Sequence, residues 1–159
     1  MEIKDDAYDK YRIVPNIKLG EFNFDTPIRN YLEGKTYSFH RDLEHSEEGF
    51  YSFHDPFIDV YVDSKGIITH ISCEQFLIFE NVNLIGNRYE NFSFTPKLIE
   101  DVWINKNGED IKQTVFDIDN LGLQIWVYKK LIVTVICSNL DEIPNAASSW
   151  LQIVKLFSS

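Results

Sequence analysis

The chain of 159 residues is short of basic side chains, of glycine and of cysteine. Its 15 Lys and Arg residues stand against 25 Asp and Glu residues, so the formal net charge at pH 7 is −10 with the histidines neutral. Because an excess of acid repels phosphate backbones and no basic segment offsets it, we expect no direct binding to nucleic acid. The partner that such a charge favours is a cationic protein.

The motifs of common catalytic and cofactor sites are also missing. With seven glycines in all, the chain contains no Gly-x-Ser-x-Gly elbow, no Gly-x-Gly-x-x-Gly fingerprint and no phosphate loop. Its four histidines match no ligand spacing such as His-Glu-x-x-His, and the paired acids lack the glycine-bearing loop that calcium needs. We therefore expect no metal, no cofactor and no catalysis.

Segments that would direct the chain to a membrane or out of the cell are not evident. The N-terminal residues are acidic and polar, and no apolar run approaches the roughly 20 residues that cross a bilayer. We therefore expect a cytoplasmic protein without a membrane partner. In that reducing compartment Cys73 and Cys137 favour buried free thiols over a disulfide, although the two could pair.

What the chain does contain is apolar and aromatic residues, 44% and 14% of the total, enough for one folded domain over residues 1–159. Its apolar positions mostly alternate, which is typical of antiparallel strands. The pattern predicts two hairpins, at 57–63 with 67–73 and at 123–128 with 131–137. The two align with a one-residue gap at the turn, so that Tyr61 falls on Trp126 and Cys73 on Cys137.

Each hairpin is preceded by an aromatic strand, at 49–54 and 113–118, and further upstream by a Thr-Pro pair that is typical of a helix start. We therefore predict an α+β fold. Its antiparallel sheet would be built from two pseudo-repeats of helix-strand-strand-strand, about 15–80 and 84–138, with the helices packed on one face. A C-terminal helix is expected at about 145–157, and chance likeness between short elements is the alternative to a repeat.

Strand alternation also divides the hairpin residues between two faces of the sheet. Ile58, Val60 and Val62 would point toward the helices, and aromatic and polar residues toward the opposite side. Such a mixture of aromatic and acidic side chains favours protein binding, whereas packing under loops or the terminal helix is the alternative. The predicted partner-binding residues are Asp59, Tyr61, Asp63, His70, Gln124, Trp126 and Tyr128, with Glu47, Glu48 and Asp55 from an acidic approach.

Several segments together resemble a known family. They are 15–20 (Pro-Asn-Ile-Lys-Leu-Gly), the following Thr-Pro helix, the Tyr- and Phe-rich strands, the turn at 62–67 and 83–86 (Asn-Leu-Ile-Gly). The sequence resembles the small acidic immunity proteins of bacterial contact-dependent inhibition and related polymorphic toxins. The resemblance implies a cytoplasmic protein that binds and neutralises a cognate toxin domain, often a nuclease. The tandem organisation is also similar, in architecture only, to beta-lactamase inhibitory proteins, in which a concave sheet grips an enzyme.

Two other functions fit the composition. The first is an enzyme or small-ligand domain whose pocket lies between sheet and helices, with His70 or His54 as a base. The second is a scaffold that self-associates through a sheet edge or the aromatic face. The resemblance favours a monomer that forms a 1:1 complex with a cationic toxin domain.

Overall fold

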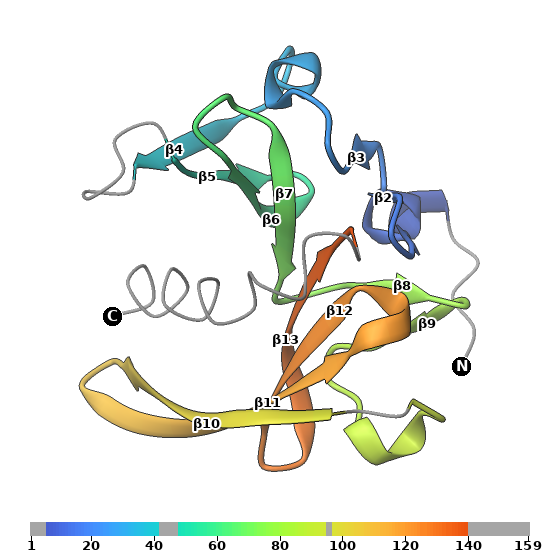
Figure 1. The fold of residues 1–159 in the computed structure, drawn as a ribbon, viewed down its shortest axis with the longest axis vertical. Coiled ribbons are helices and arrows are strands. Elements are labelled where there is room, and N and C mark those ends of the chain that lie inside the picture. The colour runs from blue at the N-terminus through green and yellow to red at the C-terminus, as the bar shows by residue number, and fades with distance from the viewer. Residues whose placement is uncertain (1–5, 42–47, 95–96, 140–159) are drawn as a thin grey trace.

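The computed structural model describes residues 6–41, 48–94 and 97–139. An eight-stranded antiparallel sheet dominates it, in the order β10-β11-β12-β13-β7-β6-β5-β4 (Figure 1). Four strands come from the first half of the chain: β4 (Tyr37–Arg41), β5 (Gly49–His54), β6 (Phe57–Val62) and β7 (Ile68–Cys73). Four come from the second half: β10 (Lys97–Lys106), β11 (Glu109–Ile118), β12 (Leu123–Tyr128) and β13 (Leu131–Ser138). The two meanders meet where β13 pairs with β7.

Short elements accompany this sheet. A three-stranded sheet consists of β1 (Ile13–Val14), β2 (Lys18–Leu19) and β3 (Phe22–Asn23), and a two-stranded one of β8 (Ile78–Phe79) and β9 (Val82–Asn83). The helical turns are all of the 3₁₀ type: η1 (Asp6–Tyr11), η2 (Ile28–Tyr31), η3 (Tyr89–Asn91) and η4 (Asp119–Leu121). In the described part of the chain no helix is long and apolar enough to span a membrane.

The predicted α+β fold, with helices packed on one face of the sheet, is wrong. The described residues are mostly strand, and their longest helical turn has six residues. Thr26 does not cap a helix; its hydroxyl donates to the backbone oxygen of Asn23 at 2.8 Å. Only the four-residue turn η2 follows. So short a segment makes too few intrahelical hydrogen bonds to offset the cost of nucleating an α-helix. The C-terminal helix expected at 145–157 lies outside the described residues.

The second predicted helix, after Thr95-Pro96, is strand β10. Leu98, Ile99 and Val102 have helical spacing in the sequence, but Val102 and Ile104 are buried while Trp103 between them is 66% exposed. Asn107 and Gly108, both with positive φ, form a two-residue turn into β11. An Asn-Gly pair of this kind is a strong hairpin signal that our sequence interpretation missed.

Both halves of the chain repeat the same backbone arrangement. In the first half the Asp25 amide donates to the Ile68 carbonyl oxygen at 2.9 Å, and in the second Gly86 donates to Ile132 at 2.8 Å. The β6–β7 and β12–β13 ladders each carry one irregularity, after Tyr61 and after Trp126. The repeated unit is therefore a small hairpin, a 3₁₀ turn and four strands, in place of the helix-strand-strand-strand unit that we predicted.

The main core lies between one face of the large sheet and the small hairpins. The large sheet contributes the fully buried Val60, Ile125 and Val135. The small hairpins contribute Phe22 of β3 and Leu84, which follows β9, and both are also fully buried. Burial of each such side chain stabilises the fold by about 1.5–3 kcal/mol. This face, called the core face below, is the one to which alternation assigned Ile58, Val60 and Val62.

The opposite face of the large sheet is concave. Strands β10 and β5 are six positions apart in the sheet, which would separate them by about 29 Å if the sheet were flat. Ile104 of β10 and Phe50 of β5 nevertheless line the same small cavity. The sheet therefore curls strongly toward this side, as the accumulated twist of neighbouring strands allows. We call this side the concave face below.

The cysteines are free and buried in the two strands that join the halves. The Cys137 thiol lies 3.4 Å from the Ile71 carbonyl oxygen, to which it donates. A hydrogen bond to Cys137 and burial raise the pKa of the Cys73 thiol well above its usual value. The structure thus has the buried free thiols that the sequence favours, and the raised pKa lowers the fraction of reactive thiolate at Cys73.

Gly122 supports a prediction about the junction before β12. It has a φ of +63°, and a Cβ there would lie 2.4 Å from the Ser138 backbone oxygen. We expect Gly122→Ala to lower the free energy of unfolding by about 3 kcal/mol or more, since steric overlap adds to the roughly 1–2 kcal/mol cost of a left-handed residue. Urea denaturation measures this.

Gly34→Ala is the matched control for that substitution. Gly34 has a similar φ of +76°, but no atom lies within 4 Å of its added Cβ. Its replacement therefore carries only the backbone cost of about 1–2 kcal/mol. Equal losses for the two variants would show that the close approach to Ser138 is relieved without cost.

Candidate functional site

A cavity of about 190 Å³ lies on the concave face. Two carboxylates, Asp59 and Glu74, line it together with Tyr61 and Trp126. Asp59, Tyr61 and Trp126 were predicted as partner-binding residues, and the structure brings these three together. Strand alternation places Asp59 and Tyr61 two residues apart on one face of β6, and the repeat places Trp126 at the position equivalent to Tyr61.

Asp59 is half-buried and held by one hydrogen bond. The Ser52 hydroxyl on the paired strand β5 donates to Asp59 Oδ1 at 2.6 Å. Burial raises the pKa of the Asp59 carboxyl; Glu74 also raises it, whereas the Ser52 hydrogen bond and His40 lower it. Since burial penalises the charged form, the Asp59 carboxylate is incompletely compensated within the protein.

Tyr61 and Glu74 adjoin this carboxyl in different ways. Burial, reinforced by Asp59 and Glu74, raises the pKa of the Tyr61 phenol, which therefore stays neutral at physiological pH. The Tyr61 ring packs against Phe50, with centroids 5.0 Å apart. Glu74 is exposed, just beyond the end of β7, so the cavity has a negative, accessible edge.

Trp126 and Gln124 are buried and fix each other in place. They are 1% and 2% exposed, and Trp126 Nε1 donates to Gln124 Oε1 at 2.9 Å. The amide of Gln124 in turn donates to Asp117 Oδ1 at 3.3 Å. Gln124 and Asp117 are paired across β12 and β11 in the same way as Asp59 and Ser52 are paired across β6 and β5. Trp126 therefore lines the cavity as a fixed side chain, Gln124 supports it from outside the lining, and neither offers a partner much contact area.

His70 is buried on the concave face but does not line this cavity. Its Nδ1 lies 2.6 Å from the Thr69 hydroxyl, and burial lowers its pKa well below the usual value. The imidazole is therefore neutral at physiological pH. Its ring meets that of Tyr61 edge-on, which makes His70 a packing partner of the site.

Asp63 and Tyr128 lie at the turns of the two hairpins, away from the cavity lining. Asp63 Oδ1 accepts hydrogen bonds from the backbone amides of Lys65 and Ile67, at 2.9 and 3.0 Å, and so closes the β6–β7 turn. Tyr128 is half-buried with the Lys129 ammonium over its ring at 5.2 Å. Both predicted residues thus have local roles.

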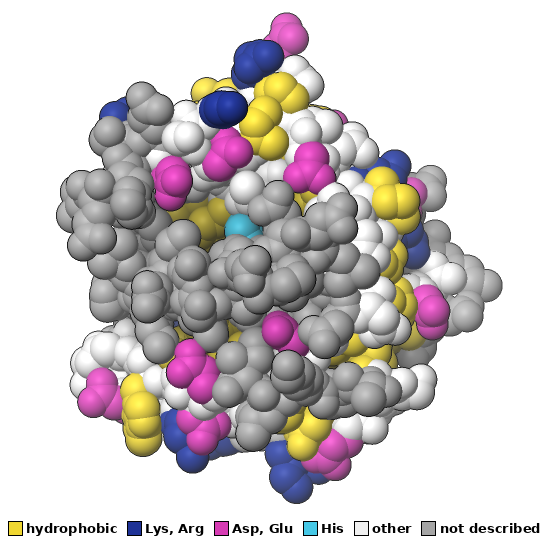
Figure 2. Space-filling model, in the orientation of Figure 1, with side chains coloured by type: hydrophobic (Ala, Val, Ile, Leu, Met, Phe, Trp, Pro, Cys, Tyr) yellow, Lys and Arg dark blue, Asp and Glu magenta, His cyan; other side chains and the backbone are white. Residues whose placement is uncertain are grey.

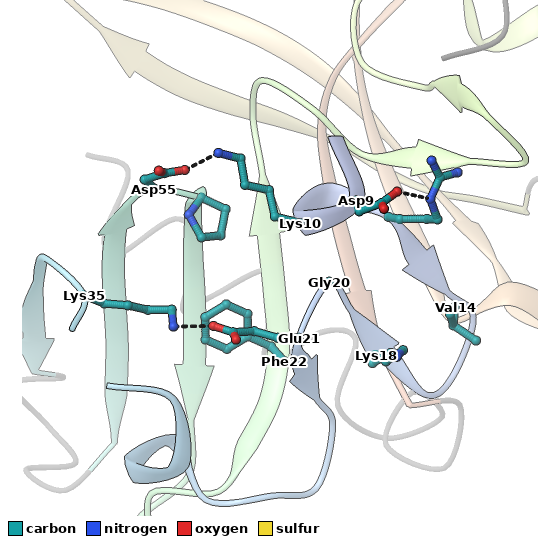
Figure 3. A pocket seen from close by; sticks show the side chains of 11 residues that line it. Asp9, Lys10, Val14, Lys18, Gly20, Glu21, Phe22, Lys35 and Asp55 are labelled. Carbon is teal, nitrogen blue, oxygen red and sulfur yellow. Dashed lines mark hydrogen bonds and ion pairs between the residues drawn. The ribbon is translucent and has the colours of Figure 1, made fainter. Parts of the chain in front are cut away.

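Asp55 lines a different hollow, a groove of about 740 Å³ beside η1 and the β1–β3 sheet. Figure 3 shows most of its charged side chains joined in pairs, with Lys18 apart from them. Lys10 pairs with Asp55, Lys35 pairs with Glu21, and a third pair joins the Arg12 guanidinium to a carboxylate across 3.1 Å. The groove has the volume of a small-molecule site, but most of its charges already have partners.

Of the other acidic residues predicted to bind the partner, Glu48 does not line the concave cavity. Glu48 is half-buried just before β5, and Glu47 lies outside the described residues. Asp and Glu side chains are scattered over the side of the molecule drawn in Figure 2, and Lys and Arg lie toward its margins. The negative charge therefore supplies a general field, while Asp59 and Glu74 supply the local one.

Among the cavity residues that the sequence interpretation missed are Glu74, Lys106 and Gln113. Glu74 directly follows β7, on the same alternation as Ser72, so its place was accessible to face assignment. Lys106 and Gln113 come from β10 and β11, and their approach depends on the curl of the sheet. No local pattern reports that curl.

No group of three or more His, Cys, Asp or Glu side chains suited to a metal ion occurs within residues 6–41, 48–94 and 97–139. Comparison of the chain with known protein families, curated proteins and solved structures finds no match. The geometry of the concave face and the chemistry of its residues therefore carry the functional argument.

The buried Asp59 carboxyl predicts a stabilising substitution. The pKa of Asp59 is higher in the folded than in the unfolded protein. The free energy of unfolding therefore falls as the pH rises from the pKa of the unfolded state to that of the folded state, above which the carboxyl is ionised in both states. Asp59→Asn keeps an oxygen for the Ser52 hydroxyl and removes the buried charge. We expect a higher urea midpoint than wild type at pH 7 and a difference that shrinks on acidification; a lower midpoint at pH 7 would contradict the assigned burial cost.

Proposed function

We propose that this protein is a cytoplasmic immunity protein that binds and neutralises the cytotoxic domain of a bacterial contact-dependent inhibition or related polymorphic toxin. It acts without catalysis, as a monomer in a 1:1 complex, and its target is a cationic domain, in our proposal a nuclease. The observation that carries the proposal is the cavity on the concave face, where Asp59 and Glu74 stand against aromatic walls.

Electrostatics support this assignment at two ranges. The net charge of −10 steers a cationic protein toward the molecule from a distance. At contact, the incompletely compensated Asp59 carboxylate gains a partner that the free protein does not supply. A nuclease active site is cationic because it holds phosphates, so it offers the complementary charges.

The alternative of an enzyme or small-ligand domain has less support. Neither the cavity on the concave face nor the groove beside η1 includes a histidine in its lining. His54 is exposed at the end of β5, and His70 is buried and neutral outside both linings. The groove's paired ions would have to separate before a charged ligand could bind there.

Co-expression tests the proposal in cells. The reading frame immediately upstream is expected to encode a toxin whose C-terminal domain arrests growth when it is produced alone. Production of this protein in the same cells should restore growth, and Gly122→Ala, with a destabilised fold, should protect less well. Growth arrest that is unchanged by wild-type protein at equal or higher levels would refute the proposed function.

A further inference from the structure

Gln113 carries a buried hydrogen-bond acceptor without a partner beside the cavity on the concave face. Its side chain is 5% exposed, lines the cavity, and has no partner for Oε1 within the described part of the chain. Burial of an acceptor without a donor is unfavourable, because the hydrogen bond to water is lost and not replaced. A ligand that brings a donor into the cavity relieves this cost.

Other groups in the lining also call for a donor with positive charge. Asp59 and Glu74 are acceptors when ionised, and among the described residues of the lining only Lys106 is a cation. The formal charge of these described lining residues is therefore −1. Lys106 is exposed near the tip of the β10–β11 hairpin, at the edge of the site.

The apolar part of the lining suits a flat cation. Phe50, Tyr61 and Trp126 line the cavity, and Tyr61 is the most exposed of the three, since Trp126 and Phe50 are buried. A guanidinium group stacks on aromatic faces and is more weakly hydrated than an ammonium, so it loses less on entering such a site. The volume of about 190 Å³ is small for a drug-sized ligand, for which pockets span roughly 300–1,000 Å³, and fits one long side chain.

From this combination we propose that the cavity is a receptor for a single arginine side chain of the partner protein. The guanidinium donates to Gln113 Oε1 and to the carboxylates of Asp59 and Glu74, and it lies against the aromatic wall. That the arginine belongs to a toxin domain rests on the proposed function. The recognition of a guanidinium group by this cavity does not depend on the proposed function.

A titration with small probes tests the receptor directly. Nα-acetyl-arginine amide is added to the protein and followed by NMR through the Gln113 side-chain amide and the Trp126 indole N–H. Saturable shifts in the millimolar range are expected. Nα-acetyl-citrulline amide, which has nearly the same shape without the charge, should leave both resonances in place, and Nα-acetyl-lysine amide should bind more weakly than the arginine probe.

Two variants tie the shifts to the cavity. Gln113→Leu removes the buried acceptor, so affinity for the arginine probe should fall by about tenfold while stability is kept or raised. Lys106→Gln removes the opposing charge at an exposed position, so affinity should rise by about two- to fivefold. Absence of saturable shifts, equal binding of the citrulline probe, or unchanged affinity in both variants would overturn the receptor.

The outcome is separable from that of the functional proposal. A protein that protects cells from the toxin but does not bind the arginine probe would retain the proposed function and lose the receptor. A protein that binds the probe in the cavity but gives no protection would retain the receptor and lose the toxin as its partner.

Discussion

Replacement of Val60 by aspartate is expected to unfold the protein. Val60 is fully buried in β6 and pairs with Tyr51 and Ile71 on the adjacent strands. An aspartate there places a carboxyl in the core between the large sheet and the small hairpins, where no cation is available among the core residues. The expected loss is about 4–5 kcal/mol or more, which approaches the total stability of many domains of this size.

Trp103→Asp is the matched control for Val60→Asp. It also replaces an apolar strand residue by aspartate, but Trp103 is 66% exposed on the edge strand β10. Its effect on unfolding should stay within about 1 kcal/mol. Far-UV circular dichroism during urea denaturation distinguishes the two, and a cooperatively folded Val60→Asp protein of wild-type stability would contradict the assigned core face.

Reversal of charge at Asp59 is expected to weaken binding of the toxin domain strongly. Asp59→Lys removes a half-buried carboxylate of the cavity and places an ammonium where the partner brings its own cation. Loss of an attractive contact and gain of a repulsive one should cost about 2–4 kcal/mol, or roughly 30- to 1,000-fold in affinity. Calorimetric titration of the purified components measures this change.

The control for Asp59→Lys makes the same change in net charge elsewhere. Asp55→Lys alters the groove beside η1, where Asp55 pairs with Lys10, and leaves the concave cavity untouched. It should lower affinity only by the weak long-range effect. Because Asp59→Lys also removes the Ser52 hydrogen bond, the exposed Glu74→Lys provides a second reversal with little risk to folding. Equal effects of the Asp55 and Glu74 variants would show that only the overall charge matters.

Alternating sequence patterns correctly predicted strands that pair with a neighbour close in sequence. The alternation at Phe57–Val62 and Leu123–Tyr128 predicted both hairpins, and the structure confirms them, including the equivalent registers. Turns with Gly66 or with two lysines of positive φ join their strands. In such hairpins the pattern and the turn specify the same pairing, so few distant contacts are needed.

The helices failed for a physical reason that is visible in the same residues. A Thr-Pro pair followed by apolar residues at helical spacing also fits a strand whose buried positions are β-branched, as Val102 and Ile104 are in β10. The Asn107-Gly108 turn decides between the two, because its positive φ values connect strands of a hairpin. At η2 a helical turn forms, but it ends after four residues, and the chain continues into the edge strand β4.

For the candidate site, the sequence predicted which side chains share a face of the sheet but not how exposed those side chains are. Alternation correctly put Asp59, Tyr61 and Trp126 on one face, but it did not predict that Trp126 is only 1% exposed there. The curl brings Lys106 and Gln113 of the second half near Asp59 of the first. Contacts between strands so far apart in sequence depend on the whole sheet, so local periodicity cannot report them.

Association between the purified protein and the toxin domain encoded beside it tests the central claim most directly. Binding kinetics measured at rising salt report both affinity and steering, since the screening length falls from about 30 Å at 0.01 M to about 3 Å at 1 M. We predict a 1:1 complex at low salt whose association slows by about tenfold or more at high salt. No measurable complex at low salt, or a complex indifferent to salt and to Glu74→Lys, would contradict the account.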